Sequence, residues 1–136
     1  MNRREAREEA FKLVFQITAQ RDCYPEVVDR FAEENAALKK TDKKQYKYIV
    51  SAANSVFEKV DELDEIIAAH LSADWKVERL SKMSLAILRL AVYEIKYVED
   101  IPDSVSVNEA VELAKVYATD DARAFIFGVL AGVLGA

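Results

Sequence analysis

The stretch that decides the fold is ILRLAVYEIKYVEDIPDSVSVNEAVELAK, residues 87–115. Its first part is so densely apolar that little of a helical circumference can be polar, and such a helix lies inside a core. Pro102 ends this helix because the residue before a proline is disfavoured in the α region. Ser106 and Glu109 have the spacing of a capping box, in which each side chain bonds a free amide of a new helix. The stretch therefore predicts a buried helix, a proline turn and a second helix.

Apolar residues recur at steps of three and four through most of the chain, which is typical of amphipathic helices. Asn2 can cap a first helix with Glu5 in a box-like position, and Pro25 suits the first turn of a second helix. A long third helix is expected after a cap at Thr41 or Asp42. The first helix is expected to bury Ala6, Ala10, Leu13, Val14 and Ile17.

Further along, the sequence predicts a turn or single-turn helix at residues 72–75, a central helix from near Ser81 and a sixth helix at residues 107–117. Asp120 can cap the last helix. No strand-like alternation or internal repeat appears, and few glycines and prolines are available for turns. We expect an all-α fold of about seven helices.

The composition and length of the chain are those of a small soluble protein without disulfides. With 136 residues, the chain is long enough for one domain, or two tightly packed subdomains, with a sizeable core. No apolar run approaches the roughly 20 residues that span a bilayer, and the charged N-terminus lacks the apolar segment of a signal peptide. The single cysteine, Cys23, cannot form an internal disulfide. These features favour a soluble cytoplasmic protein that does not associate with membranes.

The overall charge does not favour nucleic acid. Nineteen basic residues against 24 acidic ones leave a net charge of −5, so any phosphate binding must come from a local patch. Residues 1–12 hold such a patch, although three acidic side chains lie among its basic ones. The four basic side chains are Arg3, Arg4, Arg7 and Lys12.

The first helix carries the best candidate for a binding surface. On an ideal helical wheel Arg4, Arg7, Phe11 and Phe15 occupy an arc of about 80° beside the apolar stripe. Guanidinium groups bind phosphates and aromatic rings offer bases a stacking face, so this arc has the form of a single-stranded RNA contact. The alternative, which spacing alone favours, is that the phenylalanines widen the core stripe while the arginines pair with neighbouring glutamates.

A second candidate lies at the start of the last helix, at Asp121, Arg123 and Phe125. Free amides at a helix N-terminus attract phosphate, and a phenyl ring there can stack on a base. By pattern alone, Phe125 is more simply a packing residue, and Asp121 complements the helix dipole. Gly128 and Gly132 form a small-residue pair that permits the close approach of another helix, or of an RNA backbone to Gly128.

No catalytic constellation is apparent in the sequence. Conspicuous carboxylates such as Glu94 and Glu109 are explained by capping and by hydrogen bonds between helices. With one histidine and one cysteine, the spacing of zinc ligands is absent, and no phosphate-binding glycine loop or nucleophile elbow occurs. We expect no enzyme, no metal and no cofactor.

Five segments together resemble one known family. LRLAVYEI (88–95), DIP (100–102) and VNEAVELAK (107–115) are similar to the signature of the NusB family of bacterial transcription antitermination factors. RREAREEAF (3–11) is similar to the arginine-rich opening of that family, and TDDARAFIFGVL (119–130) resembles its closing helix. Residues 20–80 match in helical pattern only.

The resemblance implies a fold and a function. It implies two small packed helical bundles, over residues 1–72 and 73–136, and a factor that acts with the ribosomal protein NusE. Together they would bind boxA-type single-stranded RNA of nascent ribosomal RNA transcripts and join the RNA polymerase antitermination complex. The RNA-binding residues that the resemblance and the patterns indicate are Arg3, Arg4, Arg7, Phe15, Asp121, Arg123, Phe125 and Gly128.

Two departures from the family pattern keep other functions open. Phe127 stands where relatives have an asparagine, and Ser84 stands at a position that is often acidic. They are consistent with a helical protein–protein interaction module that binds little RNA. The RNA-targeting domain of an RNA methyltransferase also resembles the family, but we expect such a domain to precede a catalytic one, and these 136 residues show no cofactor-binding segment. A homodimer that hides the RNA-binding face is a further alternative, which the spacing does not decide.

Overall fold

The computed structural model describes residues 1–135, which form eight α-helices and two short 3-10 helices and contain no strand. The expectation of an all-α fold is confirmed. The α-helices are α1 (Arg3–Ala19), α2 (Tyr24–Glu34), α3 (Ala36–Thr41), α4 (Lys43–Glu58), α5 (Val60–Ala68), α6 (Lys82–Tyr97), α7 (Asp103–Tyr117) and α8 (Asp120–Gly135). The 3-10 helices are Arg21–Cys23 and Val77–Arg79.

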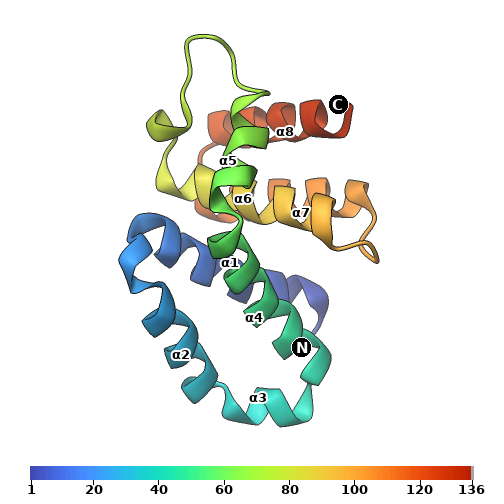
Figure 1. Ribbon diagram of the computed structural model, residues 1–136. Helices are drawn as coiled ribbons and strands as arrows, with labels where there is room; N and C mark the ends of the chain where they lie inside the picture. The colour runs from blue at the N-terminus through green and yellow to red at the C-terminus, as the bar shows by residue number, and fades with distance from the viewer. Residues whose placement is uncertain (136) are drawn as a thin grey trace.

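The helices form two groups that share one apolar core (Figure 1). Helices α1 to α4 pack together at one side, and α6, α7 and α8 pack together at the other. Helix α1 contacts both α4 and α6, so it lies where the groups meet. Helix α5 precedes residue 72 but packs mainly against α6, and it also contacts α8. The buried side chains therefore run without interruption from α1 through α6 to α8.

The start of α1 follows the sequence closely. The Asn2 side chain accepts a hydrogen bond from the Glu5 amide (2.8 Å), and the Glu5 carboxylate accepts one from the Asn2 amide (2.9 Å). This reciprocal pair is the predicted capping box. The five apolar residues expected to face the core from α1 are all buried.

The start of α7 differs from the prediction. The helix begins at Asp103 directly after Pro102, whose carbonyl accepts from the amides of Val105 and Ser106. Proline already has the fixed φ that suits a helix start, so the chain needs no further residues before it turns. The predicted capping box is therefore wrong: Ser106 lies one turn inside the helix and buried, and its hydroxyl bonds Glu94.

Two further boundaries were predicted incorrectly. The long third helix is broken at Lys59 (φ −106°, ψ 15°) into α4, which packs on α1, and α5, which packs on α6. The periodic pattern persists because each half buries its own stripe, so periodicity alone does not detect the bend. The last helix is capped by the Thr119 hydroxyl, which accepts from the Ala122 amide at 3.1 Å, rather than by Asp120. No helix within residues 1–135 is long and apolar enough to cross a membrane.

Candidate nucleic-acid interface

The arginines at the start of α1 do not form one exposed ridge. Arg7 is only 3% exposed, so the prediction that it lies on the surface beside Arg4 is wrong. Its position explains this, because Arg7 lies one turn before the buried Ala10 and Phe11 and two turns before the buried Val14. The Arg7 side chain therefore projects into the contact between α1, α6 and α7, where it cannot reach RNA.

The buried Arg7 is neutralised by Glu94 of α6. Arg7 Nε donates to Glu94 Oε2 at 2.8 Å and Nη2 donates to Oε1 at 3.0 Å. Tyr48 of α4 donates to Oε2 at 2.5 Å, and Ser106 of α7 donates to Oε1 at 3.0 Å. One carboxylate thus joins four helices through four hydrogen bonds.

The charge states of this network follow from its burial. Burial opposes the charged form of Arg7, but the hydrogen bond and the charge of Glu94 outweigh it and raise the pKa of Arg7. Burial, and then the neighbouring Glu94 charge, raise the pKa of Tyr48, so its phenol stays a donor. The arginines of α1 do pair with glutamates, but the partners lie on α6 and α7 and are not the neighbouring glutamates of α1 that were predicted.

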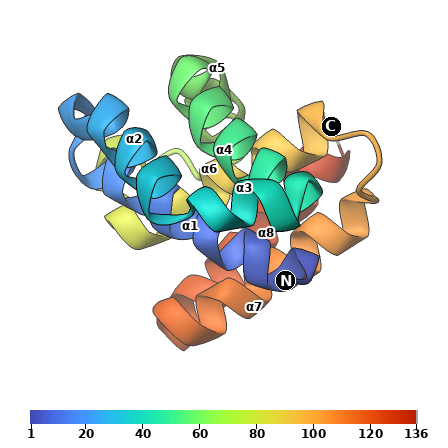
Figure 2. The ribbon, with the colours of Figure 1, turned by 90° about the horizontal axis from the view of Figure 1, so that it is seen from below.

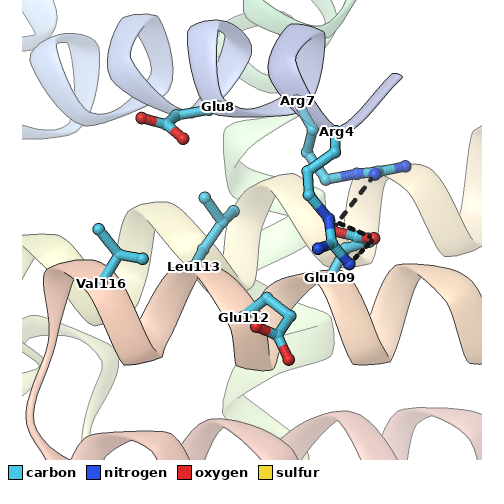
Figure 3. A pocket seen from close by; sticks show the side chains of 7 residues that line it. All are labelled: Arg4, Arg7, Glu8, Glu109, Glu112, Leu113 and Val116. Atoms are coloured by element: carbon cyan, nitrogen blue, oxygen red, sulfur yellow. Dashed lines mark hydrogen bonds and ion pairs between the residues drawn. The ribbon is translucent and has the colours of Figure 1, made fainter. Parts of the chain in front are cut away.

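Arg4 remains at the surface but is held by α7 (Figure 3). Its guanidinium donates three hydrogen bonds of 3.0–3.2 Å to Glu109, while its side chain stays 67% exposed. The Glu109 hydrogen bond, followed by its charge, raises the pKa of Arg4. Glu109 also lies 3.9 Å from Arg7 Nη1. Arg4 is therefore an exposed cation, but the Glu109 carboxylate occupies its guanidinium, so an RNA phosphate would have to compete with Glu109.

Arg3 and Phe15 lie at the two ends of α1. Arg3 is half-buried, donates to Gln45 Oε1 at 2.8 Å and stacks 4.2 Å above the Tyr48 ring. Phe15 is half-buried, with its ring centroid 6.4 Å from that of Phe11. Phe11 itself is buried, 4.9 Å from the Tyr117 ring. Core packing is therefore correct for Phe11, whereas Phe15 keeps part of its ring accessible.

The second candidate group lies around an open groove at the start of α8. The Phe125 ring faces the Trp75 ring across 6.3 Å at 48°, and Trp75 is 49% exposed. Asp121 lines the same groove, whereas Arg123 does not and pairs with Asp120 at 3.4 Å. The groove is lined by Trp75, Arg79, Leu80, Ser81, Ser84, Asp121, Ala122 and Phe125.

Sequence reasoning missed Trp75 and Arg79. The available signal was the single tryptophan of the chain, which stands in the polar segment SADWK and belongs to no apolar stripe. For residues 72–75 the sequence predicts only a turn or single-turn helix, and a turn is found there. Ser84 is buried at this groove and places no charge there.

The remaining candidate, Gly128, lies on the exposed face of α8. A Cβ atom built there would have no atom of the protein within 4 Å. Its neighbour Phe127 is 52% exposed. A Cβ at Gly132 would instead lie 2.9 Å from the Nδ1 atom of His70, so that glycine serves packing between α8 and the turn that follows α5. The two glycines therefore have different roles.

The family model described as the NusB family matches residues 4–134, almost the full length. The chain belongs to the NusB family. A transcription antitermination protein NusB of Ruminiclostridium cellulolyticum is 47% identical over 133 residues, which cover 98% of this chain and 88% of that protein. The NusB of Clostridium novyi is 39% identical, and the match covers 100% of both chains.

Solved NusB structures share the fold. The structure of NusB from T. maritima superposes with a TM-score of 0.86 at 30% identity, covering 99% of this chain and 92% of that one. NusB in a solved complex of the antitermination factors NusB and NusE with dsRNA superposes with a TM-score of 0.82 at 26% identity, covering 98% and 96%. This member of the NusB family therefore keeps the arrangement of helices seen in its relatives.

The chemistry that this NusB-family surface offers is that of a binding site. The Trp75–Phe125 groove presents aromatic faces with the exposed Arg79 guanidinium on its lining, and Arg4 presents a separate exposed cation at the start of α1. No group of three or more histidine, cysteine, aspartate or glutamate side chains in the described part of the chain is placed to hold a metal ion. Aromatic faces with nearby guanidinium groups are the elements of a surface that binds unpaired bases and phosphates.

Proposed function

We propose that this chain is an RNA-binding transcription antitermination factor that acts with NusE on boxA-type RNA of nascent ribosomal RNA transcripts. Membership of the NusB family supports the proposal, as does the likeness to the NusB chain of a complex with NusE and RNA. The protein would work by assembly within the RNA polymerase antitermination complex and not as an enzyme. Its place of action would be the bacterial cytoplasm, where transcripts are made.

The observation that carries the proposal is the aromatic groove at the start of α8. Trp75 and Phe125 are tilted toward each other, with Arg79 and Asp121 also on the lining. Two tilted rings that are partly open to solvent suit a base inserted against them. A guanidinium at the rim suits the phosphate of that nucleotide, and the Asp121 carboxylate can accept from a base amino group.

Helix α1 would contribute less than its arginine count suggests. Arg3 and Arg4 are the RNA contacts that we retain there, and Phe15 offers a half-buried ring. Arg7 would act indirectly, because its pair with Glu94 holds α1 against α6. Arg123 can reach RNA if a phosphate replaces Asp120 as its partner, and Gly128 leaves room for a backbone to approach α8.

The proposal is tested by titrating fluorescent boxA-type RNA with the protein, with and without NusE. Trp75→Ala and Phe125→Ala should each weaken binding by about 1–3 kcal/mol, since stacking on a ring contributes that much per base. Phe127→Ala is the matched control, because Phe127 is an exposed ring of the same helix outside the groove.

Three results would contradict the proposal in different ways. If Phe125→Ala lowers the melting temperature and leaves RNA affinity unchanged, Phe125 is a packing residue. If the protein binds NusE and no RNA, the alternative of a protein interaction module holds. If duplex RNA of the same sequence binds as tightly as the single strand, stacking of unpaired bases is not the basis of recognition.

A further inference from the structure

A lysine-rich surface lies on α3 and the first turns of α4, outside the groove described above. Five lysines occur within nine residues, and every one of them is exposed. None of them forms an ion pair within the described part of the chain. We call this surface the lysine edge; it consists of Lys39, Lys40, Lys43, Lys44 and Lys47.

The net charge of the segment that carries the lysine edge is opposite in sign to that of the rest of the protein. Asp42 is the only acidic residue between positions 35 and 57, so this segment carries a net charge of +4 while the remaining residues carry −9. The Asp42 carboxylate is already occupied, because it accepts from the N-terminal amino group at 3.1 Å and caps α4 through the Gln45 amide. It therefore does little to neutralise the lysines around it.

The lysine edge is continuous with the start of α1. The N-terminal amino group bonds Asp42, and Arg3 bonds Gln45 in the first turn of α4. In Figure 2 the N-terminus lies beside α3. On its other side, Lys44 and Lys47 share a groove with Glu99 and Asp100. The three other lysines of the edge, Lys39, Lys40 and Lys43, are exposed and do not line that groove.

We infer that the lysine edge binds the phosphate backbone of RNA that flanks the element held in the Trp75–Phe125 groove. This inference rests on the proposed function and extends it. Lysine side chains are flexible, strongly hydrated point charges, which suit phosphates without reading the bases. Protein interfaces are depleted in lysine and enriched in aromatic residues, so an exposed run of lysines does not have the composition of a protein docking site.

The position of the lysine edge sets the length of RNA that reaches it. Arg7 of α1 bonds Glu94 of α6, and Thr18 near the end of α1 bonds Arg89, so α1 and α6 run in opposite directions. Ser81 and Ser84 at the start of α6 line the groove, which therefore lies toward the end of α1, whereas the lysine edge adjoins the start of α1. The two surfaces are therefore separated by about the length of α1, roughly 25 Å at a rise of about 1.5 Å per residue.

The test compares boxA-type RNA with the same RNA carrying polyuridine flanks of about ten nucleotides, enough to cross roughly 25 Å at about 3.4 Å each. The variant is Lys40→Gln with Lys43→Gln. Its matched control is Arg30→Gln with Lys96→Gln, which removes the same charge from exposed positions on α2 and α6. Circular dichroism checks that both variants fold.

For the flanked RNA, the lysine variant should reduce the slope of log affinity against log salt by about 1.4, since each phosphate contact on a single strand contributes about 0.7. At low salt its affinity should fall on the order of tenfold. The unflanked RNA and the control variant should show little change. In a parallel measurement, brief acetylation followed by mass spectrometry should show Lys39 to Lys47 protected by the flanked RNA, with Lys96 unprotected.

The outcomes separate the inference from the function on which it rests. If the parent protein binds flanked RNA and the lysine variant keeps the same salt slope, the inference is overturned and the proposed function stands. If the lysine variant loses NusE and keeps RNA, the edge is a protein surface and the inference is also overturned. If the parent protein binds neither RNA, both fall.

Discussion

Arg7 of α1 and Glu94 of α6 form a buried ion pair with two hydrogen bonds of 2.8 and 3.0 Å, and they are 3% and 1% exposed. All polar side-chain atoms buried in the described part of the chain have a partner. A buried ion pair stabilises little relative to apolar residues, but the loss of one partner leaves an uncompensated charge. The pair therefore acts mainly to fix how α1 lies against α6.

Glu94→Gln should destabilise the protein by about 3–5 kcal/mol, because it leaves the Arg7 charge buried without a counter-charge. The measurement is urea unfolding followed by circular dichroism. Glu62→Gln, which removes an exposed carboxylate that bonds Tyr97, serves as the control and should change stability far less. A loss below about 1 kcal/mol for Glu94→Gln would mean that water reaches the pair.

Glu109→Gln should strengthen RNA binding at low salt. The Glu109 carboxylate competes with phosphate for Arg4, and a neutral amide competes less. Glu112→Gln is the control, because Glu112 lines the pocket between α1 and α7 that also holds Arg4 and Glu109 (Figure 3), but pairs with Lys115 at 3.0 Å. Equal affinities for the Glu109→Gln protein and the parent would remove Arg4 from the RNA-binding surface.

Replacement of the two interior glycines of α8 should have opposite effects. Gly128→Ala should stabilise the protein by about 1 kcal/mol through helix propensity, since its Cβ meets nothing within 4 Å. Gly132→Ala should destabilise it by about 1–3 kcal/mol, because its Cβ would lie 2.9 Å from His70. Thermal unfolding measures both, and the same sign for both would contradict the packing described. Weaker RNA binding by Gly128→Ala would support close approach of the backbone there.

The Asp42 carboxyl should titrate below its ordinary value of 3.8. The hydrogen bond from the N-terminal amino group lowers the pKa of Asp42, and the Gln45 amide adds to the effect. A lowered pKa in the folded state means that this contact stabilises above pH 3.8 and is lost as pH falls below it. Carbon-detected NMR follows the titration. N-terminal acetylation should return the midpoint toward 3.8; an unshifted midpoint in the unmodified protein would exclude the contact.

Much of the fold was predictable because it depends on local rules. The capping box of Asn2 and Glu5 and the buried stripe of α1 need only spacing and side-chain chemistry. The bend at Lys59 was not predictable, since α4 and α5 keep one periodic pattern while they pack on different helices. The capping box predicted at Ser106 was wrong for a similar reason, because the Ser106 hydroxyl donates to Glu94 on another helix and does not cap α7.

The sequence predicted the type of candidate site, an aromatic surface with arginines, but only some of the residues that form it. Phe125 and Asp121 were singled out by their place at a helix start, and the groove contains both. Trp75 and Arg79 join them only through the path of the chain between α5 and α6, which no spacing rule describes. The prediction for Arg7 was wrong because a helical wheel gives the direction of a side chain but does not show that Glu94 of another helix lies there as its partner.

The Arg7–Glu94 contact also has a consequence for synthesis on the ribosome. The partners are separated by 87 positions, and Ser106, which shares the same carboxylate, follows twelve positions later. At about 5–20 residues per second, roughly 4–17 seconds pass between translation of the arginine codon and that of its counter-ion. Helix α1 can pack on α2 and α4 during that interval, but Arg7 lacks its counter-charge, and α1 its contact with α6, until Glu94 has been made.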